Sequence, residues 1–295
     1  MPEPEPESAP GNQPPGLVLV STPIGNLGDM TARGLAVLRH ADLVLCEDTR
    51  VTAHLLRHFG LSARTLALHD HNEDARIPEV LRLLARGSTV ALVSDAGTPL
   101  VSDPGYRLVR AALAAGAHVT AAPGANAAVM ALTLSGLPPH PYLFIGFPPP
   151  KGAARQAAFA RLRAAERAGL GATMVMYESP HRAGETLADL AACFGDRPAA
   201  LTRELTKRFE EVVRGTLPEL AARFATVEPR GEVTLVVGPP PEEAATEAAD
   251  LDALLREAMR TESVREAAAG VAAATGIAKR LVYARALALR SESET

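Results

Sequence analysis

The sequence predicts an α/β protein with a mostly parallel N-terminal sheet, a mixed second sheet and a small helical appendage at the C-terminus. In the first half, apolar runs of strand length alternate with helical patterns, as in parallel sheets covered by helices. In the second half, the run 209–214 follows its predecessor after a short polar turn, which favours an antiparallel hairpin. After residue 246 the apolar spacing is helical.

The N-terminal α/β domain is expected at residues 16–137. It follows a stretch at 1–15 whose alternating proline and glutamate have the composition of a disordered acidic tail. Helical patterns in this domain stop at glycines such as Gly60 and Gly87. The expected strands are apolar runs that end in turn-forming polar residues: 17–21, 43–46, 65–68, 89–93 and 118–121.

A second α/β domain is expected at 138–238, because the helical rhythm pauses at the Gly/Pro-rich segment 136–141. Its helices are expected near 152–167, 181–194 and 217–224. Its strands are expected at 142–145, 173–177, 199–203, 209–214 and 232–237.

A Pro/Glu-rich linker at 239–247 leads into the helical appendage, 248–295. The helices expected there are 251–259, 263–274 and 277–289. Ser263 and Glu266 have the spacing of a capping box at the start of the second of them. Two short helices across a glycine turn suggest a helix-turn-helix-like unit, and an ordinary helical docking appendage fits the same pattern.

Composition excludes several classes of protein. The net charge of −4 argues against holding nucleic acid by overall charge, although local basic patches still count. No apolar run is long enough to span a bilayer and the N-terminus has no signal-peptide pattern, so a cytoplasmic protein is expected. Cys46 and Cys193 have no metal-type spacing and are expected to be thiols in a reducing compartment. No metal is expected, since His69 and His71 lack further ligands.

The segment 94–105 is the strongest ligand-binding signal in the chain. A strand there breaks into small polar residues and is followed by a helix, which is where open α/β sheets bind ligands. Gly97 and Gly105 permit a close approach of the backbone to a ligand. In the alternative reading, Ser102 or Asp103 simply caps the next helix, with Pro104 near its first position.

Three further loops are expected at the same edge of the first sheet: 21–26, 47–50 and 123–127. Together with 94–102 they would converge on one crevice. The crevice is not expected to bind a dinucleotide or ATP, because the chain has neither a GxGxxG fingerprint in a strand–turn–helix frame nor a Walker A motif. A GxSxG nucleophile elbow is also missing.

Six motifs together resemble the tetrapyrrole methylase family, and in particular its ribosomal RNA 2′-O-methyltransferases. They are STPIGNL (21–27), CEDTR (46–50), SDAGTPLVSDPG (94–105), PGAN (123–126), YESPHR (177–182) and RELTK (203–207). The resemblance covers roughly 16–239 in unbroken order. It implies the two-domain fold of class III methyltransferases, S-adenosylmethionine bound between the domains and a homodimer. It also implies methylation of the 2′-hydroxyl of cytidine 1402 in the 16S rRNA of the 30S subunit.

The family's cofactor contacts carry over to matching positions of this chain. Thr98 departs from the pattern, because tetrapyrrole-specific relatives have Gly-Asp-Pro where this chain has Gly-Thr-Pro. Asp95, in the previous turn, is the candidate that would supply the missing carboxylate. The implied contacts are Pro23, Asp95, Thr98, Val101, Asn126, Ala127, Tyr177 and Val233.

Asp48 and Glu47, at the end of an expected strand, are the first candidates for a general base or a group that orients the hydroxyl. Pairing of Asp48 with Arg50, or capping of the following helix, would explain the same residues. Arg50 and Lys207 are further candidates at the catalytic site, and Glu204 could orient Lys207.

The stretch from Lys151 to Arg182 contains six basic residues and only two acidic ones, and this excess of positive charge could bind RNA phosphates. Lys151, Arg182 and Arg203 are the expected RNA contacts. A solvated helix face or salt bridges within the second domain would account for the same residues. Two other functions remain open: a tetrapyrrole C-methyltransferase, which would have little use for the basic stretch, and a non-catalytic RNA-binding module.

Overall fold

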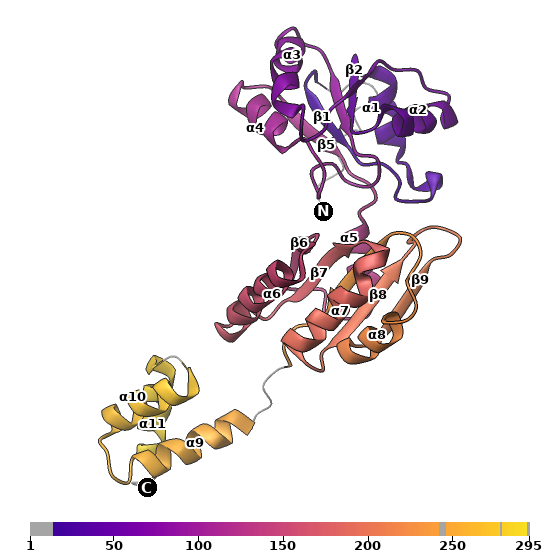
Figure 1. Cartoon of the computed structure of the whole chain (residues 1–295). Helices are drawn as coiled ribbons and strands as arrows, with labels where there is room; N and C mark the ends of the chain where they lie inside the picture. The colour runs from indigo at the N-terminus through magenta and orange to yellow at the C-terminus, as the bar shows by residue number, and fades with distance from the viewer. Residues whose placement is uncertain (1–13, 242–245, 278, 294–295) are drawn as a thin grey trace, which may run out of the picture. The chain divides into compact units, whose positions relative to one another are not determined.

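The computed structural model describes residues 14–241, 246–277 and 279–293. Most of the expected acidic tail and part of the expected linker lie outside the described residues. The contacts between residues group into two units, Met1–Pro239 and Pro240–Thr295 (Figure 1). The described part of the chain has no helix long and apolar enough to cross a membrane.

The first sheet is parallel throughout, as predicted. Its strand order is β3-β2-β4-β1-β5. The five strands lie within one or two residues of their expected positions: β1 (Leu17–Val20), β2 (Leu43–Cys46), β3 (Thr65–Ala67), β4 (Val90–Val93) and β5 (Val119–Ala122).

Helices cover both faces of this sheet, with α1 and α2 on one side and α3 and α4 on the other (Figure 1). Alternate strand residues enter two separate apolar clusters: Val18 and Val44 pack in one, Leu17 and Leu43 in the other. The near-continuous apolar runs of the sequence follow from burial on both faces. The helical elements are η1 (Leu27–Asp29), α1 (Ala32–His40), α2 (Thr49–His58), α3 (Glu73–Ala85), α4 (Tyr106–Ala114) and α5 (Ala127–Ser135).

The alternative reading of Ser102 and Asp103 as helix caps is wrong. Helix α4 begins at Tyr106, and its N-cap is Gly105 at φ +120°. A side chain at Gly105 would place its Cβ 2.6 Å from Cδ2 of Leu92, so glycine is required for space as well as for φ. The side chains of Ser102 and Asp103 are therefore not used to cap α4.

The second sheet is mixed, which confirms the predicted fold class. Its order is β6-β7-β10-β8-β9, in which only the β6–β7 pair is parallel. The predicted hairpin is the antiparallel pair β8–β9. The strands are β6 (Tyr142–Gly146), β7 (Thr173–Glu178), β8 (Pro198–Arg203), β9 (Glu211–Thr216) and β10 (Val233–Val237), and the helices are α6 (Gly152–Arg167), α7 (Pro180–Phe194) and α8 (Leu217–Phe224).

Helix α5 packs on the second sheet, against β7, β8 and β10. Ala131 and Leu132 of α5 share an apolar cluster with Val175 and Val236, and Ile24 from the loop after β1 joins it. The other face of the sheet buries Met176 and its neighbours beneath α6, α7 and α8. The predicted domain boundary at residue 137 thus falls after α5, a helix that packs on the second sheet.

The C-terminal unit has three helices in its described residues, α9 (Thr246–Ala258), α10 (Val264–Thr275) and α11 (Lys279–Ser293). The predicted capping box is present: Ser263 accepts from the backbone N–H of Glu266, whose carboxylate accepts from that of Ser263. Gly276 ends α10 in the left-handed conformation, at φ +74°. Leu255, Val271 and Val282 belong to one apolar cluster of this unit.

Candidate active site

A cavity of about 380 Å³ lies where the loop after β4 meets the ends of β7 and β10. Its first wall comes from 95–98 and 101–103, its second from Phe147 and 177–180, and its third from 231–234; Ile24 and Ala127 complete it. We call this space the main cavity. It lies at the carboxyl end of parallel strand β4, as predicted for the segment 94–105.

Backbone and side-chain hydrogen bonds anchor the loop after β4. Gly97 exchanges two backbone hydrogen bonds with Thr22, in the loop after β1. The Thr98 hydroxyl donates to the carbonyl of Ala125 at 3.0 Å and accepts a hydrogen bond from the Ser21 hydroxyl at 3.2 Å. The first, fourth and fifth strands thus contribute loops to one structure. This convergence confirms the predicted meeting of 21–26, 94–102 and 123–127.

Two residues of this loop have backbone conformations that disfavour a side chain. Leu100 has φ +71° and Ser102 has φ +69°. Such strain is concentrated at binding and catalytic sites, where the surrounding structure holds it in place. Val101, between them, lines the main cavity.

The predicted cofactor contacts mostly line the main cavity, among them Asp95, Thr98, Val101, Ala127, Tyr177 and Val233. The other two lie elsewhere. Pro23 lines a smaller neighbouring pocket with Asp95, and Asn126 caps α5 by accepting from the backbone N–H of Val129.

Several cavity residues are not among the predicted contacts. Ser102 and Asp103 could have been found, because both lie in the motif that the sequence analysis singled out. No signal in the sequence pointed to three others from the second domain: Phe147, which follows β6, and Gly231 and Glu232, which precede β10. Only the tertiary structure brings them to the loops of the first domain. The full set is Ile24, Ala96, Gly97, Ser102, Asp103, Phe147, Glu178, Ser179, Pro180, Gly231, Glu232 and Thr234.

A second, more open crevice adjoins the main cavity. It is lined by Glu47, Asp48, Thr49, Arg50, Ala67, His69 and Asp95, and we call it the acidic crevice. Asp95 lines both spaces. Its carboxylate accepts a hydrogen bond from the backbone N–H of Asp48 at 3.1 Å. The predicted catalytic residues Glu47, Asp48 and Arg50 are therefore together, next to the predicted cofactor residues.

Asp48 performs both of its alternative roles. It caps α2 by accepting from the backbone N–H of Arg50 at 2.8 Å, and it forms a bidentate ion pair with the Arg50 guanidinium. These hydrogen bonds from Arg50 lower the pKa of Asp48 to about 2. A carboxylate held so firmly in its ionised form is a weak general base.

Glu47 is better matched to proton removal. Burial raises the pKa of its carboxyl, and the negative charges of Asp95 and Asp103 raise it further. Burial likewise raises the pKa of Asp95 and of Asp103. A group of carboxyls with raised pKa values beside a cavity is typical of catalytic sites.

Lys207 and Glu204 form a separate pair at the third wall of the main cavity. The Lys207 ammonium donates to Glu204 at 2.9 Å and to Glu232, a cavity residue, at 2.8 Å. Burial acts to lower the pKa of Lys207, but these hydrogen bonds outweigh it and the pKa is raised. The pairing thus favours a positively charged Lys207 held by carboxylates.

Three basic side chains of the stretch 151–182 are held in ion pairs, whereas Lys151 and Arg161 are exposed. Arg155 is buried and donates to Asp189 at 2.6 Å, and Arg163 pairs with Glu166. Arg182 is mostly buried as well. Of the three predicted RNA contacts, Arg203 pairs with Glu211 and Lys151 is exposed.

Within the described ranges, no three His, Cys, Asp or Glu side chains lie close enough together to hold a metal ion. His69 instead contacts Asn72, whose amide nitrogen lies 3.0 Å from its Nε2.

Comparison with known families matches residues 16–221 to "Tetrapyrrole (Corrin/Porphyrin) Methylases" and 245–290 to the "RsmI C-terminal HTH domain". Proteins named "Ribosomal RNA small subunit methyltransferase I" are close in sequence. The one from Micromonospora olivasterospora is 48% identical over 273 residues, 90% of this chain and 85% of its own length. The one from Mesorhizobium japonicum is 46% identical and covers 95% and 94%.

Solved structures share the fold at low sequence identity. Uroporphyrin-III-C-methyltransferase from Thermus thermophilus aligns with a TM-score of 0.51 at 23% identity, over 75% of this chain and 93% of its own. Diphthine synthase aligns with a TM-score of 0.57 at 18% identity, over 75% and 89%.

Proposed function

Because the chain belongs to the ribosomal RNA small subunit methyltransferase I family of tetrapyrrole methylases, we propose that it methylates the 2′-hydroxyl of cytidine 1402 in 16S rRNA. Membership confirms the resemblance carried by the six motifs and the prediction of a methyltransferase acting on rRNA. The observation that carries the proposal is the junction at Asp95, which lines both the main cavity and the acidic crevice.

The main cavity fits S-adenosylmethionine. Its volume of about 380 Å³ lies within the range of small-molecule sites. Its lining combines apolar surface for an adenosine with the carboxyls of Asp95 and Asp103, whose negative charge would favour a sulfonium. The backbone at Gly97 has φ +82°, and a Cβ there would approach Ile24 to 3.3 Å, so glycine keeps this wall open.

S-adenosylmethionine supplies a methyl group already activated by its positive sulfur. The chain then has to hold the ribose 2′-oxygen in line with that methyl, and orientation can contribute about 7–11 kcal/mol. We assign the removal of the hydroxyl proton to the Glu47 carboxylate, and the positioning of the ribose or its phosphate to the Asp48–Arg50 pair. Lys207, held by Glu204 and Glu232, would contribute positive charge near the third wall.

RNA contacts are proposed for Lys151, which is exposed, with Arg203 available if its pair with Glu211 opens. A homodimer and a cytoplasmic location, both implied at the sequence level, belong to the same proposal.

The direct test is methyl transfer from labelled S-adenosylmethionine by the purified protein. The substrates to be compared are 30S subunits that lack the modification, naked 16S rRNA and a tetrapyrrole precursor. The labelled position in the RNA is then mapped by nuclease digestion. We expect label in one 2′-O-methylcytidine at position 1402. Label in the tetrapyrrole alone would overturn the proposal in favour of a C-methyltransferase. Cofactor binding without transfer to any substrate would overturn it in favour of a non-catalytic RNA-binding module.

A further inference from the structure

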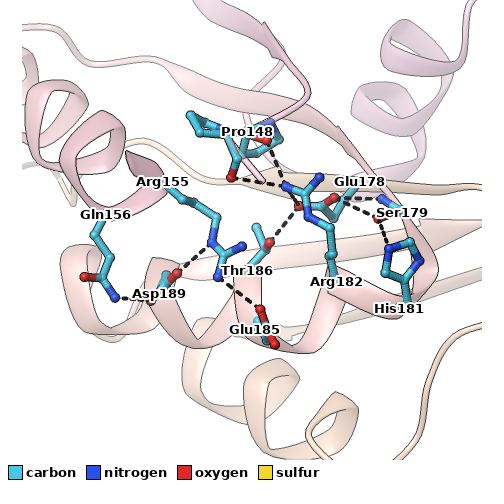
Figure 2. Close-up of polar contacts among 11 residues, drawn as sticks. Pro148, Arg155, Gln156, Glu178, Ser179, His181, Arg182, Glu185, Thr186 and Asp189 are labelled. Carbon is cyan, nitrogen blue, oxygen red and sulfur yellow. Dashed lines mark hydrogen bonds and ion pairs between the residues drawn. The ribbon is translucent and has the colours of Figure 1, made fainter. Parts of the chain in front are cut away.

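Glu178 is a fully buried carboxylate at the end of β7, and its side chain is 0% exposed. It accepts hydrogen bonds from the Thr186 hydroxyl at 2.6 Å and from the backbone N–H of Ser179 at 2.8 Å. Its only ion-pair partner in the described residues is Arg182, whose Nη2 lies 3.2 Å from Oε2 (Figure 2). Removing that arginine would leave a buried charge without its counterion.

The same guanidinium holds the loop that follows β6. Nη2 of Arg182 donates to the carbonyl of Pro148 at 2.8 Å and lies 3.3 Å from that of Pro149 (Figure 2). Prolines have no backbone N–H, so the backbone of Pro148 and Pro149 can form hydrogen bonds only through its carbonyls. Arg182 therefore connects the end of β7 to the loop after β6.

That loop carries Phe147, part of the wall of the main cavity. Phe147 is 56% exposed, and the centroid of its ring lies 5.5 Å from that of Tyr177, on β7. Gly146, before it, has φ +74°, a conformation that lets the chain turn there. The two aromatic rings come from the two segments that Arg182 connects.

We propose that Arg182 is a positioning residue that fixes this aromatic wall, through Glu178 on one side and Pro148 on the other. The inference rests on the proposed function of the main cavity as the cofactor site. It gives Arg182 a different role from the RNA contact expected from the sequence. An RNA phosphate that displaced Glu178 from the guanidinium would leave this buried carboxylate without its counterion, which is costly.

The chain contains no tryptophan, so Phe147→Trp places a single fluorescent reporter in the wall. In this background we would compare Arg182→Lys and Arg182→Met. Lysine keeps the charge, but its compact ammonium cannot reproduce the planar guanidinium bridge. Arg161→Met is the matched control, because it removes an exposed guanidinium from α6 of the same domain.

We expect both Arg182 variants to lower the tryptophan anisotropy without ligand. They should also weaken S-adenosylhomocysteine binding, measured by calorimetry, by roughly 10- to 100-fold, with methionine the more severe. Arg161→Met should change neither. Affinity for undermethylated 16S rRNA and its salt dependence should match the parent protein in the Arg182 variants.

Unchanged anisotropy and cofactor affinity in the Arg182 variants would overturn the inference. So would a salt slope of RNA binding reduced by about one with cofactor affinity intact, since that marks a phosphate contact. If Arg182→Met does not fold, the double variant Glu178→Gln with Arg182→Met removes both charges. The same decreases in tryptophan anisotropy and in S-adenosylhomocysteine affinity are expected for it. If the parent protein itself binds no S-adenosylhomocysteine, the proposed function fails rather than the positioning role.

Discussion

The backbone N–H of Asp48 donates a hydrogen bond to Oδ1 of Asp95 across 3.1 Å. Asp48 follows β2 and Asp95 follows β4, two neighbouring parallel strands of the first sheet. The bond thus holds the acidic crevice against the main cavity, and the carboxylate of Asp95 reaches both. Under the proposed function, substitutions on the two sides of this contact should separate binding of the cofactor from positioning of the substrate.

Asp48→Ala should lower turnover by about 10²-fold, because the substrate loses a positioning group. Cofactor affinity should stay nearly unchanged, because Asp48 lines the crevice and not the main cavity. Loss of the α2 cap should also lower the stability slightly. Asp48→Asn is the control, since asparagine caps equally well but cannot form the ion pair with Arg50. Single-turnover rates and calorimetry measure the two effects. A collapse of cofactor binding would show that the loop is structural.

Glu47→Gln should abolish most turnover and stabilise the folded protein at neutral pH. Burial and nearby carboxylates raise the folded-state pKa of Glu47 above its unfolded value, so the folded protein binds the extra proton and loses stability as pH rises through this window. The neutral glutamine escapes that loss. Thermal unfolding at several pH values should show a higher Tm for the variant at pH 7 and a shrinking difference below the unfolded pKa. A lower Tm at pH 7 contradicts the electrostatic argument.

Asp48→Asn should show the opposite dependence on pH. Hydrogen bonds from Arg50 lower the folded-state pKa of Asp48 to about 2, so its stabilising contribution is present above the unfolded pKa of about 3.9 and is lost as pH falls toward 2. The variant should therefore have a lower Tm at pH 7 and approach the parent protein in acid. The effect should be small and sensitive to salt, because the pair is exposed.

Arg197→Met should destabilise the protein, with about 3–5 kcal/mol as the upper limit, because it leaves the buried Glu166 with only the partly exposed Arg163 as an ion-pair partner among the described residues. Arg197 Nη1 lies 2.8 Å from the Glu166 carboxylate, and the two side chains are 2% and 3% exposed. Urea unfolding measures the loss. Glu166→Gln combined with Arg197→Met should cost less than the single change, and equal costs would show that the penalty is lost packing rather than the loss of the Arg197 counterion.

Gly25→Ala should disturb the contact between the loop after β1 and the segment 204–207. A Cβ at Gly25 would lie 2.4 Å from Cγ of Lys207, in the middle of that side chain. We expect lower stability and weaker transfer activity. Lys207→Ala in the same chain should restore much of the stability, because it removes the atoms that collide. A double-mutant cycle in urea would reveal the coupling, and additive effects would place the two residues out of contact.

The sequence alone was sufficient for the fold class, because strand and helix periods are local properties. The run 43–46 had to be a buried strand, since it is apolar at every position, and Ser263 with Glu266 had to cap a helix. Family motifs also pointed to Asp95, Thr98 and Tyr177, which all line the main cavity.

Only the tertiary structure decided which charged side chains are free to bind a ligand and which are held in ion pairs within the protein. Arg155 and Arg182 are indistinguishable in sequence from exposed arginines, yet both are held by carboxylates. Arg155 pairs with Asp189 on α7, and Arg182 pairs with Glu178 at the end of β7. Phe147 and Glu232 join the cavity through strands far apart in the chain. The walls of the cavity and most of these ion pairs depend on contacts between residues that are far apart in the sequence. The local pattern of polar and apolar residues does not predict such contacts.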